Sequence, residues 1–263
     1  MDRKETLFNK EGNPLSNVKK IIGVMSGKGG VGKSTISALL ANELNKRGQR
    51  VGILDADITG PSIPRFFDVE GMKVSGDESG AHPVKTQDGI EIMSMNFLMD
   101  FEEQPVIWRG PLIGGAVKQF WTDIIWGDLD YMIIDMPPGT GDVALTAMQS
   151  IPIDGIVMVS VPQDLVSMIV AKAINMARKM DIKVLGVVEN MSYIICPKCK
   201  EKINIFESGS MEKYLKELDT ELLGELPMSK DIAGISKERC KIGDSDIVKT
   251  IGNIANKIIE LVK

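Results

Sequence analysis

The stretch that decides the fold is Gly27-Lys28-Gly29-Gly30-Val31-Gly32-Lys33-Ser34, followed by Thr35. It matches the phosphate-binding pattern G-x-x-x-x-G-K-[ST] in full. The glycines allow successive backbone N–H groups to turn inward around phosphate oxygens, and the following helix adds its positive N-terminal end. Lys33 supplies charge to the outer phosphates, and the Ser34 hydroxyl is a ligand for Mg²⁺. We therefore predict that residues 27–35 hold the phosphates of ATP together with Mg²⁺.

Short apolar strands alternate with helical patterns around this loop. Apolar runs predict strands at 19–25, 50–54, 90–97, 131–135, 155–161, 184–188 and 222–226. Helical spacing predicts helices at 33–47, 112–125, 165–180, 210–218 and 246–262, with 58–90 irregular. This alternation indicates an α/β fold with a mostly parallel central sheet and helices on both faces. We expect 1–17 to be a flexible N-terminal arm and 18–263 to form a single domain.

A dinucleotide-binding loop is the rival interpretation of the same glycines. Gly27, Gly29 and Gly32 also spell G-x-G-x-x-G, and Asp55 follows the next strand, where a dinucleotide fold keeps its ribose carboxylate. Two features favour a nucleoside triphosphate instead. A dinucleotide site has no need for the Lys-Ser-Thr run in the first helical turn, and it does not explain Asp135 at the end of another buried strand. Asp135 fits the carboxylate that supports Mg²⁺ in a P-loop enzyme.

The composition bounds the classes of protein to which this chain can belong. It has 263 residues, of which 43% are hydrophobic, enough for one large core. The net charge of −5 and the pI near 5.2 argue against nucleic acid as a partner, because such binding needs a basic face. No apolar run resembles a signal peptide or a spanning helix, so no membrane partner is expected. The three cysteines are few and odd in number, which is typical of a cytoplasmic protein.

A second lysine at the front of the loop narrows the class. Lys28 is not required to hold phosphate, and by itself it is an ordinary surface lysine. In context, the segment that it begins resembles the deviant Walker A motif of the MinD/ParA/nitrogenase-iron-protein class of SIMIBI-type P-loop NTPases. That resemblance implies that Lys28 reaches the phosphates of the partner subunit across a nucleotide sandwich dimer. It also favours Asp57 over Asp55 as the hydrolytic acid, so the predicted catalytic residues are Lys28, Lys33 and Asp57.

Cys196 and Cys199 form a C-x-x-C motif that fits several roles. It suits a redox dithiol, half of a zinc site, half of an iron–sulfur site, or two idle thiols. A zinc or cubane site needs about four protein ligands, and one chain adds only a distant Cys240 and a distant His82. Two-fold symmetry resolves the shortage, because two chains can each give both thiols to one site. We therefore favour metal ligation across a dimer, on the face that holds the nucleotide.

Together these motifs resemble those of the Mrp/ApbC family of nucleotide-binding iron–sulfur carrier proteins. The resemblance runs from about residue 20 to residue 244 and rests on the segments 27–35, 55–64, 108–111, 131–142, 188–193, 196–199 and 224–227. It implies a homodimer or heterodimer that bridges a 4Fe–4S cluster through Cys196 and Cys199 and hands it to apo-proteins. It also implies that Asn190 contacts the nucleotide base. Arg109 has a matching family position, but its chemistry assigns it no role.

The chain is expected to depart from the family pattern by lacking two additions that some members have. The arm before Asn17 has no cysteine for an extra N-terminal cluster, and no extra N-terminal domain is expected.

A positioning ATPase of the MinD/ParA type, acting on membrane or DNA, is the alternative function. Its membrane helix would be 246–262, whose apolar residues form one stripe, although a helix packed on the sheet has the same pattern. The C-x-x-C motif discriminates, because positioning ATPases have no need for it. A dithiol oxidoreductase is a third class and would exchange thiols without iron. We expect ATP hydrolysis to be slow, since its catalytic groups are divided between two chains.

Overall fold

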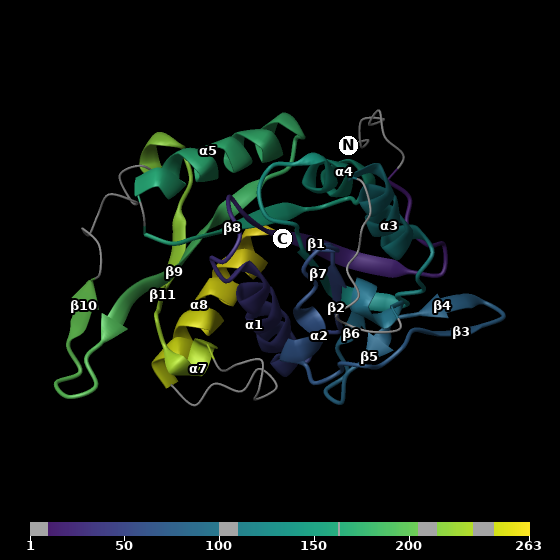
Figure 1. Ribbon diagram of the computed structural model, residues 1–263, viewed down its shortest axis with the longest axis horizontal. Helices are drawn as coiled ribbons and strands as arrows, with labels where there is room; N and C mark the ends of the chain where they lie inside the picture. The colour runs from purple at the N-terminus through teal and green to yellow at the C-terminus, as the bar shows by residue number, and fades with distance from the viewer. Residues whose placement is uncertain (1–9, 100–109, 163, 205–214, 234–244) are drawn as a thin grey trace.

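The computed structural model describes residues 10–99, 110–162, 164–204, 215–233 and 245–263, which build one large sheet covered by helices (Figure 1). The bounds of its strands are β1 Asn17–Ser26, β2 Val51–Asp55, β5 Val84–Lys85, β6 Glu91–Met93, β7 Asp128–Asp135, β8 Gly155–Ser160, β9 Val184–Ile195, β10 Lys202–Asn204 and β11 Leu222–Pro227. Within the described residues the order is β10-β9-β8-β1-β7-β2-β6-β5, with β11 paired to β9. A separate hairpin consists of β3 Ser75–Asp77 and β4 Gly80–His82.

The strands at the centre of the sheet are parallel. β1 lies between β7 and β8, β2 lies beyond β7, and β9 lies beyond β8. In the part of the chain that the structure describes, only β5 and β10 pair antiparallel within this sheet. Continuous apolar runs, such as the fully buried β8, suit strands that are covered on both faces. The carboxyl ends of the parallel strands therefore meet at one edge, where the register sets Asp55 beside Asp135.

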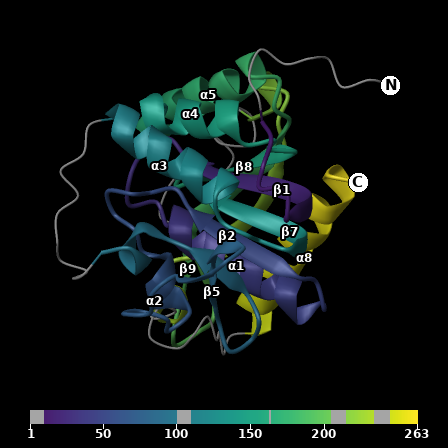
Figure 2. The ribbon, with the colours of Figure 1, turned by 90° about the vertical axis from the view of Figure 1, so that its right-hand side faces the viewer.

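Helices cover both faces of this sheet. Their bounds are α1 Lys33–Lys46, α2 Ile63–Phe66, α3 Gly110–Thr122, α4 Asp142–Ser150, α5 Asp164–Lys179, α7 Lys230–Ala233 and α8 Ser245–Leu261. Figures 1 and 2 show α3, α4 and α5 on one face, and α1, α2 and α8 on the other. This arrangement confirms the predicted α/β fold with its parallel sheet between two layers of helices.

Residues 58–97 differ from the sequence prediction. Instead of being irregular, 58–90 contain α2 and the β3–β4 hairpin. The strand expected at 90–97 ends at Met93, because the chain then turns into a 3-10 helix, Met95–Phe97. That turn buries Met95 and Phe97, so the apolar alternation seen in the sequence serves two elements rather than one.

Two other elements also depart from the prediction. Helix α4 escapes notice in the sequence because two of its three buried residues, Ala144 and Ala147, are small. Strand β9 continues past the predicted end at residue 188 to Ile195, a difference that matters for the site. Most of the helix expected at 210–218, together with Arg109 and Cys240, lies outside the described residues.

The described half of the expected N-terminal arm lies against the domain. The indole Nε1 of Trp121 donates to the carbonyl of Lys10 at 3.4 Å, and the backbone N–H of Trp126 donates to Ser16 Oγ at 2.8 Å. A Cβ on Gly12 would lie 2.6 Å from the Trp121 ring, so only glycine fits there. Residues 10–16 therefore contact α3 and the segment that follows it, whereas the flexibility of the arm 1–17 stays a prediction.

Helix α8 buries its apolar stripe inside the domain. Ile247, Ile251, Ile254 and Ile258 are each at most 5% exposed. The helix contacts β11 and α1, and Arg47, directly after α1, donates to its Gly252 carbonyl at 2.9 Å. None of the described helices is both long enough and apolar enough to cross a membrane. The stripe of α8 is therefore part of the core.

We predict that Ile251→Ala lowers the free energy of unfolding by about 2–5 kcal/mol, because it opens a cavity between α8 and the sheet. Lys249→Ala, on the exposed side of the same helix, serves as the control and should change it by less than about 0.5 kcal/mol. Urea unfolding of both variants measures the difference. Equal effects would show that the stripe does not carry the packing.

Candidate functional site

The glycine loop joins β1 to α1 and has the backbone conformation that a phosphate site needs. Gly30 and Gly32 have φ of +79° and +86°, left-handed values that glycine adopts at little cost. The carbonyl of Gly32 accepts the N–H of Ile36 at 3.0 Å, which begins α1. A Cβ on Gly32 would lie only 2.3 Å from the amide nitrogen of Asn190, so the loop passes directly over that residue. The N-terminus of α1 is thus brought to the edge where the strands end.

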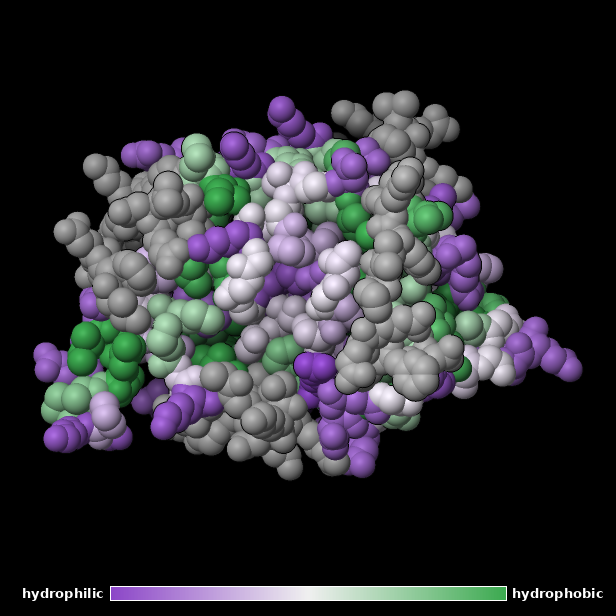
Figure 3. Space-filling view, in the orientation of Figure 1, coloured by the Kyte–Doolittle hydropathy of each residue, from purple (hydrophilic) through white to green (hydrophobic). Residues whose placement is uncertain are grey.

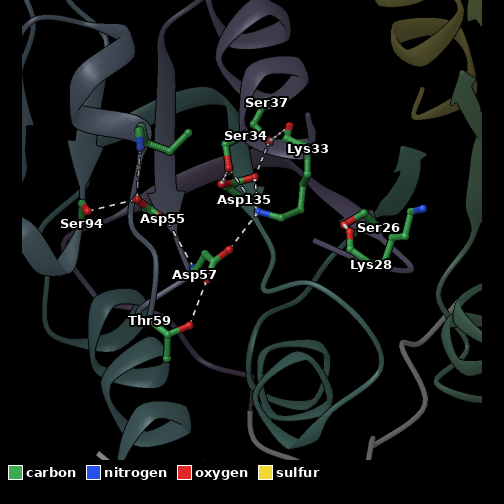
Figure 4. A network of polar contacts seen from close by, with 11 residues as sticks. Ser26, Lys28, Lys33, Ser34, Ser37, Asp55, Asp57, Thr59, Ser94 and Asp135 are labelled. Carbon is green, nitrogen blue, oxygen red and sulfur yellow. Dashed lines mark hydrogen bonds and ion pairs between the residues drawn. The ribbon is translucent and has the colours of Figure 1, made fainter. Parts of the chain in front are cut away.

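Asp135, the last residue of β7, is the centre of a buried polar cluster (Figure 4). Lys33 Nζ lies 2.9 Å from Asp135 Oδ1. The Ser34 hydroxyl donates to Asp135 Oδ2 at 2.6 Å, and the Ser37 hydroxyl donates to Oδ1 at 2.7 Å. Asp135 is fully buried, and a buried carboxylate needs such partners in place of water. The structure therefore brings together the lysine, the hydroxyl and the carboxylate that the sequence assigns to the outer phosphates and Mg²⁺.

Asp57 faces the same lysine from the loop that follows β2. Its Oδ2 lies 3.6 Å from Lys33 Nζ, and its Oδ1 accepts the Thr59 hydroxyl at 3.3 Å. Burial raises the pKa of Asp57 above its ordinary value, while the charge of Lys33 opposes that shift. A carboxylate with a raised pKa, next to the phosphate-binding lysine, is well placed to orient a water molecule or to accept its proton.

Asp55 has a different role from its neighbour. It is fully buried, and its carboxylate accepts the N–H of Asp57 at 3.2 Å, the N–H of Ile63 at 3.4 Å and the hydroxyl of Ser94 at 3.1 Å. Burial, reinforced by the neighbouring charge of Asp135, raises the pKa of Asp55 to about 8. Because these contacts occupy the carboxylate inside the protein, it is not available to a ribose. The structure thus favours a role for Asp55 in holding the turn after β2 over the dinucleotide interpretation.

Ser94 is a site residue that the sequence does not reveal. It follows β6 and reaches Asp55 only because β6 lies beside β2 in the sheet. No motif contains it, since the contact is set by strand order rather than by spacing along the chain.

Lys28 lies apart from the Asp135 cluster. Its side chain is half-buried and points away from Lys33 and Asp135, as Figure 4 shows. Its backbone carbonyl accepts the hydroxyl of Ser26 at 2.9 Å, which fixes the first turn of the loop. The Lys28 ammonium is therefore directed away from the cluster that contains Lys33.

Asn190 touches the loop itself. Its Nδ2 donates to the carbonyl of Val31 at 2.9 Å, and both residues are buried. Its Oδ1 is also buried and has no hydrogen-bond partner among the described residues. A buried acceptor without a donor is costly, so a ligand that donates there would be stabilised. The base contact of Asn190 stays a prediction, and the orphaned oxygen is the atom that fits it.

Cys196 and Cys199 lie in the turn between β9 and β10. The N–H of Cys196 donates to the carbonyl of Glu201, and the N–H of Lys200 donates to the carbonyl of Cys196, both at 2.9 Å. The backbone N–H groups of Cys199 and Lys198 lower the pKa of Cys196, helped by the Cys199 side chain and by the charge of Lys200. Cys199 is exposed. The turn therefore presents two thiols, one of them favoured as thiolate, at the tip of a hairpin.

The described residues of one chain do not complete a metal site around these thiols. They contain no group of three or more histidine, cysteine, aspartate or glutamate side chains arranged to hold a metal ion. His82 instead lies 3.0 Å from Asp77 on the β3–β4 hairpin, at the opposite end of the sheet from β10 (Figure 1). Ligands beyond the two thiols would have to come from elsewhere.

The thiol pair and the glycine loop belong to the same edge of the sheet. β9 is parallel to β8, which is parallel to β1, so all three strands point toward that edge. β9 then continues past the loop to Ile195, and the turn that follows it contains the two thiols. Figure 3 shows apolar side chains over the β10 end of this face, where Ile194, Ile195 and Ile203 are 37%, 40% and 49% exposed.

Comparison with known proteins identifies similar chains. The family described as NUBPL iron-transfer P-loop NTPase, of the ParA group, matches residues 17–262. An iron-sulfur cluster carrier protein of Clostridium perfringens (strain 13 / Type A) is 51% identical over 230 residues, which is 85% of this chain and 81% of the relative. A protein of the same description from Methanocaldococcus jannaschii is 46% identical over 231 residues, covering 86% and 80%.

Solved structures of similar shape include a nucleotide-binding protein from Archaeoglobus fulgidus in complex with ADP and with cobalt. Its TM-score is 0.75 at 44% identity, covering 85% of this chain and 87% of that chain. The cell division ATPase MinD of Pyrococcus furiosus has a TM-score of 0.65 at 21% identity, covering 92% and 99%. At that identity the likeness to MinD shows the fold alone.

We predict that the raised pKa of Asp55 makes the protein less stable as the pH rises. Between about pH 4 and pH 8 the folded chain keeps a proton on Asp55 that the unfolded chain has lost. The free energy of unfolding should therefore fall by up to about 1.4 kcal/mol per pH unit through this group. Asp55→Asn should flatten that slope in urea unfolding at pH 5, 6.5 and 8, whereas Asp88→Asn, in an exposed turn, should leave it unchanged. An unchanged slope in Asp55→Asn would refute the assignment.

Proposed function

Since this chain belongs to the family of NUBPL iron-transfer P-loop NTPases, we propose that it is an iron–sulfur cluster carrier that binds and hydrolyses ATP. The observation that carries the proposal is a pair of thiols placed by one continuous strand at the same sheet edge as a complete phosphate-binding loop. Relatives at 51% and 46% identity are iron-sulfur cluster carrier proteins, which supports the same cargo here.

The nucleotide site is proposed to bind ATP between the glycine loop and the Asp135 cluster. The donor set fits Mg²⁺, because the Ser34 hydroxyl and the Asp135 carboxylate are hard oxygen groups 2.6 Å apart. When bound, the ion would neutralise charge on the outer phosphates. Lys33, now paired with Asp135 and Asp57, is the cation that binds those phosphates, and Asp57 orients the attacking water. ADP in the similar Archaeoglobus fulgidus structure supports nucleotide binding at this fold.

A homodimer is the second part of the proposal. Lys28 points away from its own cluster, which supports its action on the phosphates held by a second chain. Hydrolysis then requires both chains, and the rate is expected to be slow. The partner copy also supplies what the thiol pair lacks, because two chains each giving Cys196 and Cys199 make the four ligands of a 4Fe–4S cluster. The cluster is the cargo, and apo-proteins that need one are the expected recipients.

The alternative functions receive less support from the described residues. A positioning ATPase that binds membrane through α8 would need the stripe that this protein buries in its core. A dithiol oxidoreductase fits the lowered pKa of Cys196 equally well, so the presence or absence of iron decides between redox exchange and cluster transfer. We propose a cytoplasmic carrier that has neither membrane nor nucleic acid as a partner.

We predict that Lys28→Ala and Lys33→Ala each abolish ATP hydrolysis and that mixing the two variants restores it. In a mixed dimer, the Lys28→Ala chain keeps its own Lys33 and receives Lys28 from the partner chain. One intact site of two in half of the dimers gives about a quarter of the wild-type rate. Phosphate release from a 1:1 mixture measures this complementation. A mixture as inactive as its components would show that Lys28 does not act in trans.

We predict that Cys196→Ser and Cys199→Ser each lose nearly all iron after anaerobic reconstitution with iron and sulfide. Each variant leaves one thiol per chain, which is too few for a shared cluster. The visible absorbance and the iron content of the desalted protein measure the loss. Cys240→Ser is the control and should bind as much iron as the wild type. Full iron in Cys196→Ser, or loss of iron in Cys240→Ser, would contradict the proposed ligands.

A further inference from the structure

Strand β9 contains an irregularity between the nucleotide site and the thiol pair. Glu189 pairs with Glu225 of β11, and Tyr193 pairs with Pro227, so two steps along β11 span four steps along β9. β9 therefore bulges at Asn190, Met191 and Ser192. Bulges re-aim side chains and are common beside functional sites.

Met191 is the strained residue of this bulge. Its φ of +56° lies in the left-handed region, which a residue with a Cβ rarely adopts. Such a conformation persists only where the surrounding structure over-determines it, and it is concentrated at functional sites. The sequence has methionine rather than glycine here, and its Cβ disfavours this conformation, so the contacts on both sides of the residue hold the kink against that cost.

Contacts on both sides of Met191 hold the bulge in place. On the inner side, Asn190 Nδ2 donates to the carbonyl of Val31 in the glycine loop at 2.9 Å. Across the bulge, the buried hydroxyl of Ser192 donates to Glu189 Oε2 at 2.6 Å. On the outer side, the carbonyl of Tyr193 accepts the N–H of Met228 at 2.8 Å. The outer half of β9 then runs without interruption to Cys196.

A change at the glycine loop has a direct route to the thiols through these contacts. Phosphate binding acts on the backbone of the loop, whose Val31 carbonyl is the partner of Asn190. The orphaned Oδ1 of Asn190 offers a second point at which a bound nucleotide would act. Both contacts act on Asn190, one residue before the left-handed kink. Cys196 follows a few residues after the kink, directly after the end of β9 (Figure 1).

We propose that Met191 is a positioning residue that couples nucleotide binding at the glycine loop to the geometry of the Cys196–Cys199 turn. The kink fixes the direction in which the outer half of β9 leaves the sheet, and Asn190 transmits the state of the loop to it. The proposal rests on the proposed function only in that a cluster carrier would use this coupling to hold or release its cargo.

Substitution of Met191 by glycine and by alanine distinguishes the effect of the backbone conformation from that of the side chain. Met191→Ala removes the side chain but keeps the Cβ that makes the left-handed conformation costly, so the strain of the kink remains. Met191→Gly removes the Cβ as well and with it the cost of the left-handed conformation, so no strain is left for nucleotide binding to release and the outer half of β9 keeps its direction. Asp181→Gly is a control for backbone relief, because Asp181 also has a positive φ, of +57°, and follows α5 outside the route.

The test is the alkylation rate of Cys196 and Cys199 by iodoacetamide in metal-free, reduced protein, with and without saturating Mg-ADP. Mass spectrometry reads each thiol peptide separately. Wild type, Met191→Ala and Asp181→Gly should each show a rate change of about fivefold on adding nucleotide, and Met191→Gly a change below about twofold. Calorimetric titration should show that all four proteins bind Mg-ADP to saturation, and light scattering should show the same oligomeric state in all four.

Two results would overturn the coupling. One is an alkylation rate in the wild type that does not change on adding Mg-ADP, and the other is a change in Met191→Gly as large as that in the wild type. Because no iron enters the measurement, its outcome is independent of the cargo. A normal nucleotide response in a protein that never binds a cluster would sink the proposed function and leave the coupling standing.

Discussion

The buried carboxylate of Asp135 is the constraint on which the rest of the structure depends. It lies at the end of a strand that is covered on both faces, so water cannot solvate it. Lys33, Ser34 and Ser37, all from the first turns of α1, satisfy it instead. This requirement locks the glycine loop to β7 and sets the lysine and the hydroxyl at the positions that a bound phosphate and its cation need. The neighbouring Asp55 organises the loop that carries Asp57 by the same means, through backbone N–H groups and Ser94.

Strand β9 connects the nucleotide site to the thiol pair. Its inner half is an ordinary parallel strand of the sheet, its bulge places Asn190 under the glycine loop, and its outer half presents the thiols. One chain thus has a glycine loop whose Lys28 points away from Asp135, and a pair of thiols that is half the ligand set of a cubane cluster. In the proposed homodimer, a second copy related by two-fold symmetry would supply both the lysine for the phosphates and the two further thiols. That shared need is the physical reason to connect ATP hydrolysis with handling of a cluster.

The sequence predicts most of the nucleotide site, because the spacing of the glycine loop fixes local backbone chemistry and Asp135 ends a recognisable apolar run. It also predicts the parallel sheet, because short apolar runs alternate with helical patterns along the chain. Ser94 and the bulge at Met191 could not be predicted, since each depends on which strands become neighbours in space. The short α4 was missed because its buried alanines give a weak apolar signal. The contacts of residues 10–16 with Trp121 and Trp126 could not be predicted either, because they bridge distant parts of the chain.

The central claim is that two copies of this chain share one cluster through the turn after β9. Native mass spectrometry of protein purified without oxygen tests it most directly, because it counts chains, iron and sulfide in a single species. The account predicts a dimer that carries about four iron and four sulfide in total, with none on the monomer. A cluster retained by a single chain, or zinc in place of iron, would contradict it.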